Sequence, residues 1–146
     1  MDELTITIGT PAEGISFTIL HRTHPTAHDY WDGNWLSVIV KYSLGRFAGS
    51  IPCDIRTEEL KAFRSQLLPL YDALVGTAEF ATMEGCVGIK LAGNRLGHIE
   101  CTGLLMDEPG IGNRLSFKFR MDQSYLPSLL QELESANAKF PVVGAT

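Results

Sequence analysis

The sequence predicts an α+β fold: a single domain over residues 1–146, built from two successive halves that each supply about four antiparallel strands and one helix. Three observations predict this class. Apolar and polar residues alternate in segments separated by short turn-like stretches, which is typical of hairpins. At one place in each half the apolar spacing lengthens to three or four residues, as in amphipathic helices. The length of 146 residues suits one hydrophobic core, so we expect the helices to pack on the sheet.

Two hairpins are predicted at the start of the chain. Residues 4–8 and 15–19 alternate apolar with polar side chains, and the stretch TPAEG between them supplies turn residues. Residues 35–44 and 47–53 form the second pair around Gly45 and Arg46, with Phe47, Ile51 and Cys53 on one face. Pro52 indicates an edge strand or a bulge, because proline cannot donate to a ladder.

A helix is predicted from Thr57 onward. Thr57 suits the N-cap, and Glu58 and Glu59 suit the positive end of the helix dipole. Pro69 lies inside the pattern and removes one backbone donor, so we expect a kink or an early end before Gly76. The apolar stripe consists of Leu60, Phe63, Leu67, Leu70, Tyr71 and Leu74.

The second half repeats this plan, with strands predicted at residues 78–83, 87–91, 96–106 and 115–121. A second helix follows, with Ser124 as its N-cap and Pro127 at the third helical position, where a missing N–H costs nothing. Its apolar stripe consists of Leu126, Leu129, Leu130 and Leu133. Residues 139–146 are expected to be frayed.

Charge and composition restrict the function. A formal net charge of -5 and a pI near 5.3 argue against nucleic-acid binding and favour a basic partner if the partner is charged. No apolar run approaches the roughly 20 residues that cross a bilayer, and the start MDELTITIGT lacks the features of a secretion signal. We therefore expect a cytoplasmic protein with no membrane partner and no cofactor. Cys53, Cys86 and Cys101 lack C-x-x-C spacing, and we expect reduced, buried thiols rather than a disulfide or metal ligands.

The stretch HDYWDGNW, from His28 to Trp35, concentrates histidine, carboxylate and tryptophan. Together with His21 and His24 it could in principle bind a divalent metal. Pro25 and the turn residues predict a loop, however, where histidines three or four apart do not converge as they do on a helix. We favour solvated loop histidines over a metal site.

Asp29 and Asp32 could be paired carboxylates for acid–base catalysis, which requires environments that separate their pKa values. Aspartates beside a glycine turn more often accept backbone hydrogen bonds, and we favour that role. Tyr30 and Trp31 are residue types that anchor protein interfaces, whereas Trp35 leads into a strand and is assigned to packing. No serine or cysteine stands in a nucleophile motif, so a binding module is favoured over an enzyme.

The segment DEPGIGNR, from Asp107 to Arg114, is glycine-rich without matching a phosphate-binding loop. A dinucleotide motif requires a third small residue followed by a helix, but Leu115 occupies that place and a strand pattern follows. We predict a long hairpin loop in which Asp107 and Glu108 could offer acidic contacts at the tip.

Four segments, taken together and in order, resemble a known family: YWDGNWL (residues 30–36), GTAEF (76–80), GHIE (97–100) and DEPGIGNRL (107–115). The chain is similar to the WapI-like family of small bacterial immunity proteins over roughly residues 30 to 133. This resemblance implies a cytoplasmic antitoxin that binds and neutralises the toxic carboxy-terminal region of a secreted contact-dependent toxin. The toxin's chemistry is not implied.

Occlusion of a toxin would require a surface that combines carboxylates with aromatic anchors. Many toxins of this kind are basic nucleases, and an acidic binder gains association rate from a basic partner. The candidate partner-binding residues are Asp29, Tyr30, Trp31, Asp32, Asp107 and Glu108. Two alternatives stay open, along with the oligomeric state. One is a self-associating structural domain, and the other is a small-molecule or metal-dependent enzyme that uses His24, His28, Asp29 and Asp32.

Overall fold

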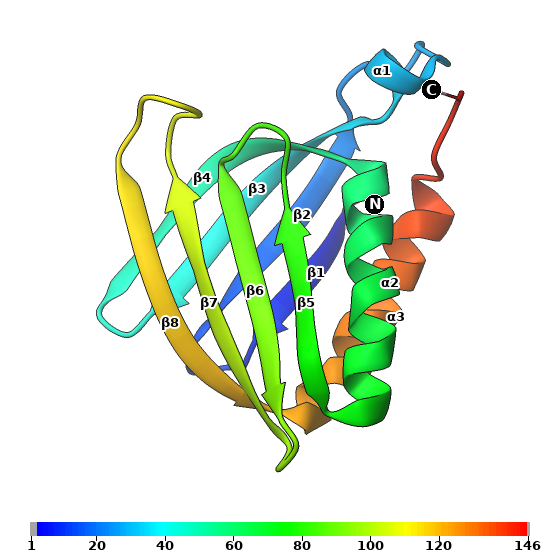
Figure 1. The fold of residues 1–146 in the computed structure, drawn as a ribbon. Helices are drawn as coiled ribbons and strands as arrows, with labels where there is room; N and C mark the ends of the chain where they lie inside the picture. The colour runs from blue at the N-terminus through cyan, green and yellow to red at the C-terminus, as the bar shows by residue number, and fades with distance from the viewer. Residues whose placement is uncertain (1–2, 146) are drawn as a thin grey trace.

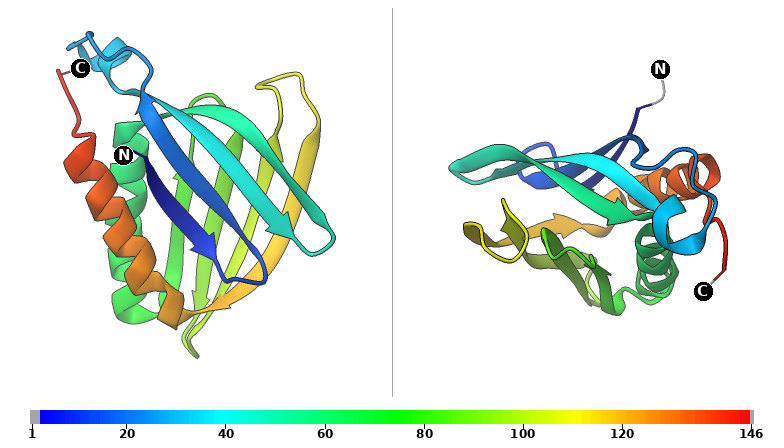
Figure 2. Two further views of the ribbon diagram at one scale, coloured as in Figure 1. Left: turned by 180° about the vertical axis from the view of Figure 1, so that it is seen from behind. Right: turned by 90° about the horizontal axis from the view of Figure 1, so that it is seen from above.

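The computed structural model describes residues 3–145 and contains two four-stranded antiparallel sheets that face each other, with two long helices along one side (Figures 1 and 2). The first sheet has the order β1-β2-β3-β4 and the second β5-β6-β7-β8, so each sheet is a series of neighbouring hairpins. Each half of the chain ends in one long helix, which confirms the predicted α+β class.

The elements keep close to the predicted ranges, with two short helical segments, α1 and η1, that the sequence pattern did not indicate. In chain order the elements are β1 (Leu4–Gly9), β2 (Gly14–Arg22), α1 (Tyr30–Gly33), β3 (Trp35–Leu44), β4 (Phe47–Arg56), α2 (Thr57–Ala73), β5 (Val75–Ala81), β6 (Val87–Asn94), β7 (His98–Met106), β8 (Arg114–Asp122), η1 (Gln123–Tyr125) and α3 (Leu126–Lys139).

Both predicted hairpins of the first half are present. The β3–β4 hairpin closes with Leu44 opposite Phe47, and Gly45 takes φ 66° in the turn, a conformation that glycine adopts without steric cost. Pro52 lies on β4, the edge strand of the first sheet, as its missing donor predicted.

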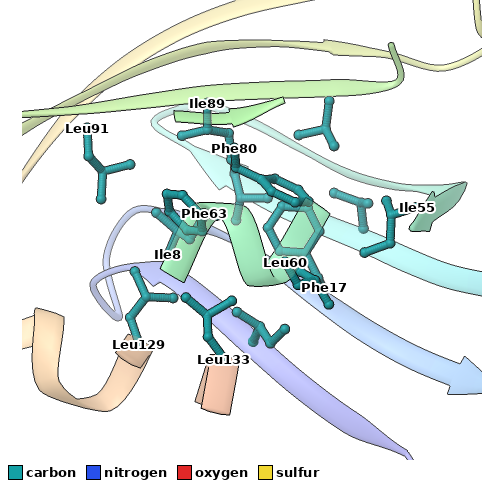
Figure 3. Packing of buried hydrophobic residues seen from close by; sticks show 14 of the residues in the cluster. Ile8, Phe17, Ile55, Leu60, Phe63, Phe80, Ile89, Leu91, Leu129 and Leu133 are labelled. Carbon is teal, nitrogen blue, oxygen red and sulfur yellow. The ribbon is translucent and has the colours of Figure 1, made fainter. Parts of the chain in front are cut away.

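The inner faces of the two sheets share one hydrophobic core with α2 and α3 (Figure 3). Phe80 of β5 contacts rings from both neighbouring layers: its centroid lies 5.4 Å from that of Phe17 on β2 and 5.6 Å from that of Phe63 on α2. Aromatic pairs at these separations add to the stabilisation from buried area. One core therefore joins the two halves of the chain.

The helices protect two of the four sheet edges. The backbone N–H of Thr7 in β1 donates to Glu132 Oε1 of α3 at 2.8 Å, and that of Glu79 in β5 donates to Gln66 Oε1 of α2 at 2.9 Å. An unpaired strand edge invites pairing with other chains, and each of these contacts occupies one backbone donor of its edge. On the opposite side of the molecule, β4 and β8 have no helix beside them within residues 3–145 (Figure 2).

The helix caps differ from those predicted. Arg56 takes the N-cap position of α2, and its backbone N–H donates to Glu59 Oε1 at 2.7 Å. The helix continues past Pro69 to Ala73, so Pro69 does not end it. Asp122, not Ser124, is the capping side chain in this region, and it caps η1: its carboxylate accepts the Ser124 N–H at 2.8 Å, and the hydrogen bonds from Ser124 lower the pKa of Asp122. The helix α3 itself has Tyr125 at its N-cap position, so Pro127 is its second residue and not its third.

The tail after α3 is held in place, contrary to the expected fraying from residue 139. The Phe140 side chain is buried, and its carbonyl accepts a hydrogen bond from Thr57 Oγ1. The Pro141 carbonyl accepts from Arg22 Nη2 at 2.6 Å, and the backbone N–H of Val143 donates to Asn34 Oδ1 at 2.9 Å. These partners lie far away in the sequence, so local patterns gave no sign of them.

Cys53 and Cys86 form a disulfide, where we expected reduced thiols. Cys53 faces inward from β4 and Cys86 precedes β6, so the packing of one sheet on the other brings their Cα atoms to 6.3 Å, within the usual disulfide range. Spacing along the chain did not reveal this pair. Cys101 is a free buried cysteine, and burial, with a smaller effect of Glu100, raises its pKa to about 12.

Candidate functional site

The six candidate partner-binding residues fall into two separate groups. Asp29, Tyr30, Trp31 and Asp32 surround α1, while Asp107 and Glu108 lie in the loop between β7 and β8. Both groups are at the same end of the molecule, with α1 beside the helices and the β7–β8 loop on the opposite side (Figure 1). We call the first group the α1 surface.

Asp29 shapes the α1 surface by starting the short helix. Its carboxylate accepts the backbone N–H of Asp32 at 3.1 Å, and its carbonyl accepts that of Gly33 at 2.9 Å. This is the turn role favoured for Asp29 by its position beside glycine. The Tyr30 and Trp31 rings meet edge to face at 5.0 Å, and 57% of Trp31 is exposed. Trp31 therefore contributes the largest exposed apolar side chain of this surface.

The α1 surface is held from beneath by Arg56, whose side chain is only 1% exposed. Its guanidinium donates to the carbonyls of Tyr30 at 2.6 Å and Trp31 at 2.8 Å, and it pairs with the Glu58 carboxylate. The same cation lies 4.8 to 5.4 Å from the ring centroids of Tyr30, Trp31 and Trp35. A cation loses its hydration when it is buried, and this loss must be offset by opposite charge, hydrogen bonds or aromatic faces. For Arg56, the three rings supply part of that compensation.

Asn34 ties the same segment to the tail. It is fully buried, and its Nδ2 donates to the carbonyls of Tyr30 at 2.9 Å and Val143 at 3.0 Å. Gly33 has no room for a side chain, because a Cβ there would lie 2.6 Å from Val143 Cγ2 and 2.9 Å from the Ala27 carbonyl oxygen. Much of HDYWDGNW therefore acts in folding, while His28, Asp29, Trp31 and Asp32 are exposed.

The second group lines a groove of about 380 Å³ between the first sheet, where β2, β3 and β4 contribute, and the β5–β6 and β7–β8 loops of the second. We call it the acidic groove, and it is lined by Leu20, Ser37, Val38, Ile39, Pro52, Cys53, Asp54, Glu84, Asp107, Glu108 and Pro109. The four carboxylates come from β4, the β5–β6 loop and the β7–β8 loop, and the described lining includes no lysine or arginine. Three segments far apart in sequence thus place like charges around one depression.

Asp107 fixes the loop that carries it. Its Oδ1 accepts the backbone N–H of Asn113 at 2.7 Å, and its Oδ2 accepts from the Asn113 side chain at 3.3 Å. The backbone N–H of Asp107 also donates to the Asn113 carbonyl at 3.1 Å, which closes the hairpin. Asp107 therefore positions the loop, while the exposed Glu108 is the freer of the two for contact.

The apolar floor of the groove was missed from the sequence. Ile39 and Pro52 are opposite each other on β3 and β4, and a bulge between Ile19 and His21 in β2 adds Leu20 nearby. The available signal was the run Val38, Ile39, Val40. If Val38 and Val40 face the core, alternation places the apolar Ile39 on the opposite face of the sheet, toward solvent.

The histidine cluster does not form a metal-binding arrangement in the described part of the chain. His24 and His28 are exposed in the loop before α1, and the His21 ring hydrogen-bonds to the Arg22 carbonyl at 2.8 Å. Between residues 3 and 145, no three histidine, cysteine, aspartate or glutamate side chains are placed to hold one ion. None of the helices in this range is long and apolar enough to cross a membrane.

Comparison with known proteins identifies a family. The sequence profile of the Immunity protein WapI-like family matches residues 5–141, which extends beyond the span of the resemblance at both ends. No curated protein sequence matches the chain significantly. Because the matched region covers nearly the whole domain, including both sheets and both long helices, the chain belongs to the WapI-like family of immunity proteins.

Proposed function

We propose that this protein protects the cell that makes it by binding the toxic domain of a cognate contact-dependent toxin in the cytoplasm and blocking it, without catalysing a reaction. The observation that carries the proposal is the family match over residues 5–141. An immunity protein of this kind acts through affinity and fit, so its function resides in surface residues and not in a reactive centre.

Two features of the surface support a protein partner. The acidic groove combines an apolar floor with exposed carboxylates, and the α1 surface presents Trp31, a residue type common at the energetic centres of interfaces. The net charge of -5 favours association with a basic partner. The proposed contact residues are Asp29, Tyr30, Trp31, Asp32, Asp107 and Glu108.

The deciding experiment is a titration of toxin activity. The first step is to identify the gene directly upstream of this chain's gene; where it encodes a large secreted protein, the probe is the purified carboxy-terminal domain of that protein. Occlusion predicts a stable complex on size-exclusion chromatography and complete inhibition at one equivalent of the immunity protein, with proportionally less inhibition below it.

Other outcomes separate the alternatives. Complete inhibition by a small fraction of an equivalent would indicate an enzyme that inactivates toxin molecules in turn. A stable homo-oligomer with no affinity for the toxin domain would support the self-associating structural domain. Either result would contradict the proposed function.

A further inference from the structure

We propose that the acidic groove is the principal docking site, and that its occupant is a segment of the toxin domain in which lysine or arginine side chains flank an apolar residue. This inference rests on the proposed function, because it names the surface and the chemistry through which that partner would bind. It goes beyond the six candidate residues by adding Ile39, Pro52, Asp54 and Glu84.

The first step of the argument is the apolar floor. The outer face of the first sheet is otherwise rich in hydroxyl groups, and the side chains of Thr5 and Thr18 hydrogen-bond across it at 3.1 Å. Ile39 and Pro52 interrupt this polar face as a cross-strand pair. Neither is needed for the core, whose members on these strands, such as Val38 and Cys53, point to the opposite face. An apolar strip on a polar outer face is available to a partner.

The second step is the charge around that floor. Asp54, Glu84, Asp107 and Glu108 place four carboxylates around the groove of a chain whose formal net charge is -5. Grouped charges of one sign beside a low-dielectric surface focus the field and attract oppositely charged groups. An apolar floor inside an acidic rim is complementary to a segment with an apolar side chain between basic ones, whose aliphatic stems can also cover the rim.

The third step concerns the mode of binding. The groove extends along β4, whose outer edge lacks a neighbouring strand within residues 3–145, so a partner strand could in principle pair with it. Pro52 lies in the middle of this edge and has no N–H to donate, which interrupts such a ladder. The occupant is therefore expected to dock through its side chains.

The fourth step separates this groove from the α1 surface. There the carbonyls of Tyr30 and Trp31 already accept from Arg56, and the Asp29 carboxylate caps α1. These groups are engaged within the protein and have less to offer a partner. The α1 surface thus serves as an internal comparison for the test.

The test compares two triple variants with equal charge change. The groove variant is Asp54→Asn/Glu84→Gln/Glu108→Gln, and it leaves Asp107 in place because that residue holds the loop. The matched control neutralises exposed carboxylates elsewhere and is Glu3→Gln/Asp72→Asn/Glu79→Gln. Circular dichroism and thermal melts are used to check that both variants fold before binding is compared.

The measurement is the association rate with the upstream-encoded toxin domain at low and physiological salt. We expect the groove variant to associate more than about tenfold more slowly at low salt, with a flatter salt dependence, and the control to change less than about threefold. Ile39→Ser should speed dissociation more than Trp31→Ala does, because the groove is proposed as the principal docking site and the α1 surface as a lesser one.

Each outcome has a distinct meaning. Suppose that the unaltered chain binds the toxin domain. Equal losses of association rate in the groove and control variants, or a larger loss of affinity in Trp31→Ala than in the groove variant, would overturn the groove assignment and leave the proposed function standing. If the unaltered chain does not bind the toxin domain at all, the proposed function fails and the groove assignment fails with it.

Discussion

Replacement of Arg56 by methionine should strongly destabilise the protein, because the α1 segment is assembled around this buried cation. The change removes two hydrogen bonds from a charged donor, at 2.6 Å to the Tyr30 carbonyl and 2.8 Å to that of Trp31. Such bonds contribute about 1.5–3 kcal/mol each. It also removes the ion pair with Glu58, which is 24% exposed, and contacts with three aromatic rings.

The apolar stem of methionine offsets part of this loss. Breaking a buried pair on one side typically costs about 3–5 kcal/mol, so we expect a decrease of about 4 kcal/mol in the free energy of unfolding. With an unfolding entropy of about 2.1 cal/mol/K per residue over 146 residues, the melting temperature should fall by about 13 °C. Arg56→Lys should lose roughly half as much, because lysine keeps the charge but not the planar fork.

The assay is urea denaturation followed by tryptophan fluorescence, since Trp31 and Trp35 both lie against the guanidinium. The control is Arg120→Met, which removes an exposed ion pair to Glu100 and should cost less than about 0.5 kcal/mol. A stability of Arg56→Met within about 1 kcal/mol of that of Arg120→Met would refute the reasoning.

Three further predictions follow from the packing, the thiols and one carboxyl. Gly33→Ala should cost about 1–3 kcal/mol, because a Cβ would meet atoms at 2.6 and 2.9 Å, while Gly88→Ala, which has open space, should be neutral in the same melt. In oxidised protein only Cys101 should react with maleimide after unfolding, and three reactive thiols would contradict the disulfide. Reduction of this disulfide, which joins cysteines 33 residues apart, should lower the free energy of unfolding by about 3.5 kcal/mol. If the protein is cytoplasmic, cells quenched with acid should yield Cys53, Cys86 and Cys101 as thiols, because that compartment is reducing. Burial raises the pKa of Glu59 above 4.5, so the folded protein binds this proton more tightly than the unfolded chain does. The free energy of unfolding should therefore fall as pH rises from 4.5 through the folded pKa. Glu59→Gln should flatten this dependence of stability on pH, and equal slopes for the two proteins would contradict it.

The sequence was sufficient for the strands and long helices because their signals are local. Alternation in the 15–19 and 35–44 segments and the three- and four-residue spacing after Thr57 report which side of an element is buried, and that is a property of a few neighbouring residues. The mutual packing of the sheets is different. It depends on which apolar faces meet, so the Cys53–Cys86 disulfide was not visible in spacing.

The tail shows the same limit. Residues 140–143 carry no periodic pattern, and their order depends on single polar contacts with Arg22, Asn34 and Thr57. Sequence patterns detect repeated apolar burial, whereas these contacts are individual and long-range. Arg56 was missed for this reason also: a charged residue at the end of a strand is ordinarily exposed, and only the three rings around it make its burial possible.

The residues that carry the family resemblance and those that form the groove are mostly different, which bears on how such a protein can serve a particular partner. The segment YWDGNWL surrounds Arg56 and holds the tail through Asn34, so it maintains the scaffold. Ile39, Pro52 and Asp54 lie outside all four resembling segments, and only the β7–β8 loop is shared between the two sets. Substitution of Ile39, Pro52 or Asp54 would alter the groove without removing a core side chain, because Val38, Cys53 and Ile55 enter the core from the opposite face of these strands. Under the proposed function, the scaffold would be common to the family while the groove would be fitted to one toxin, and the groove and control variants test that division directly.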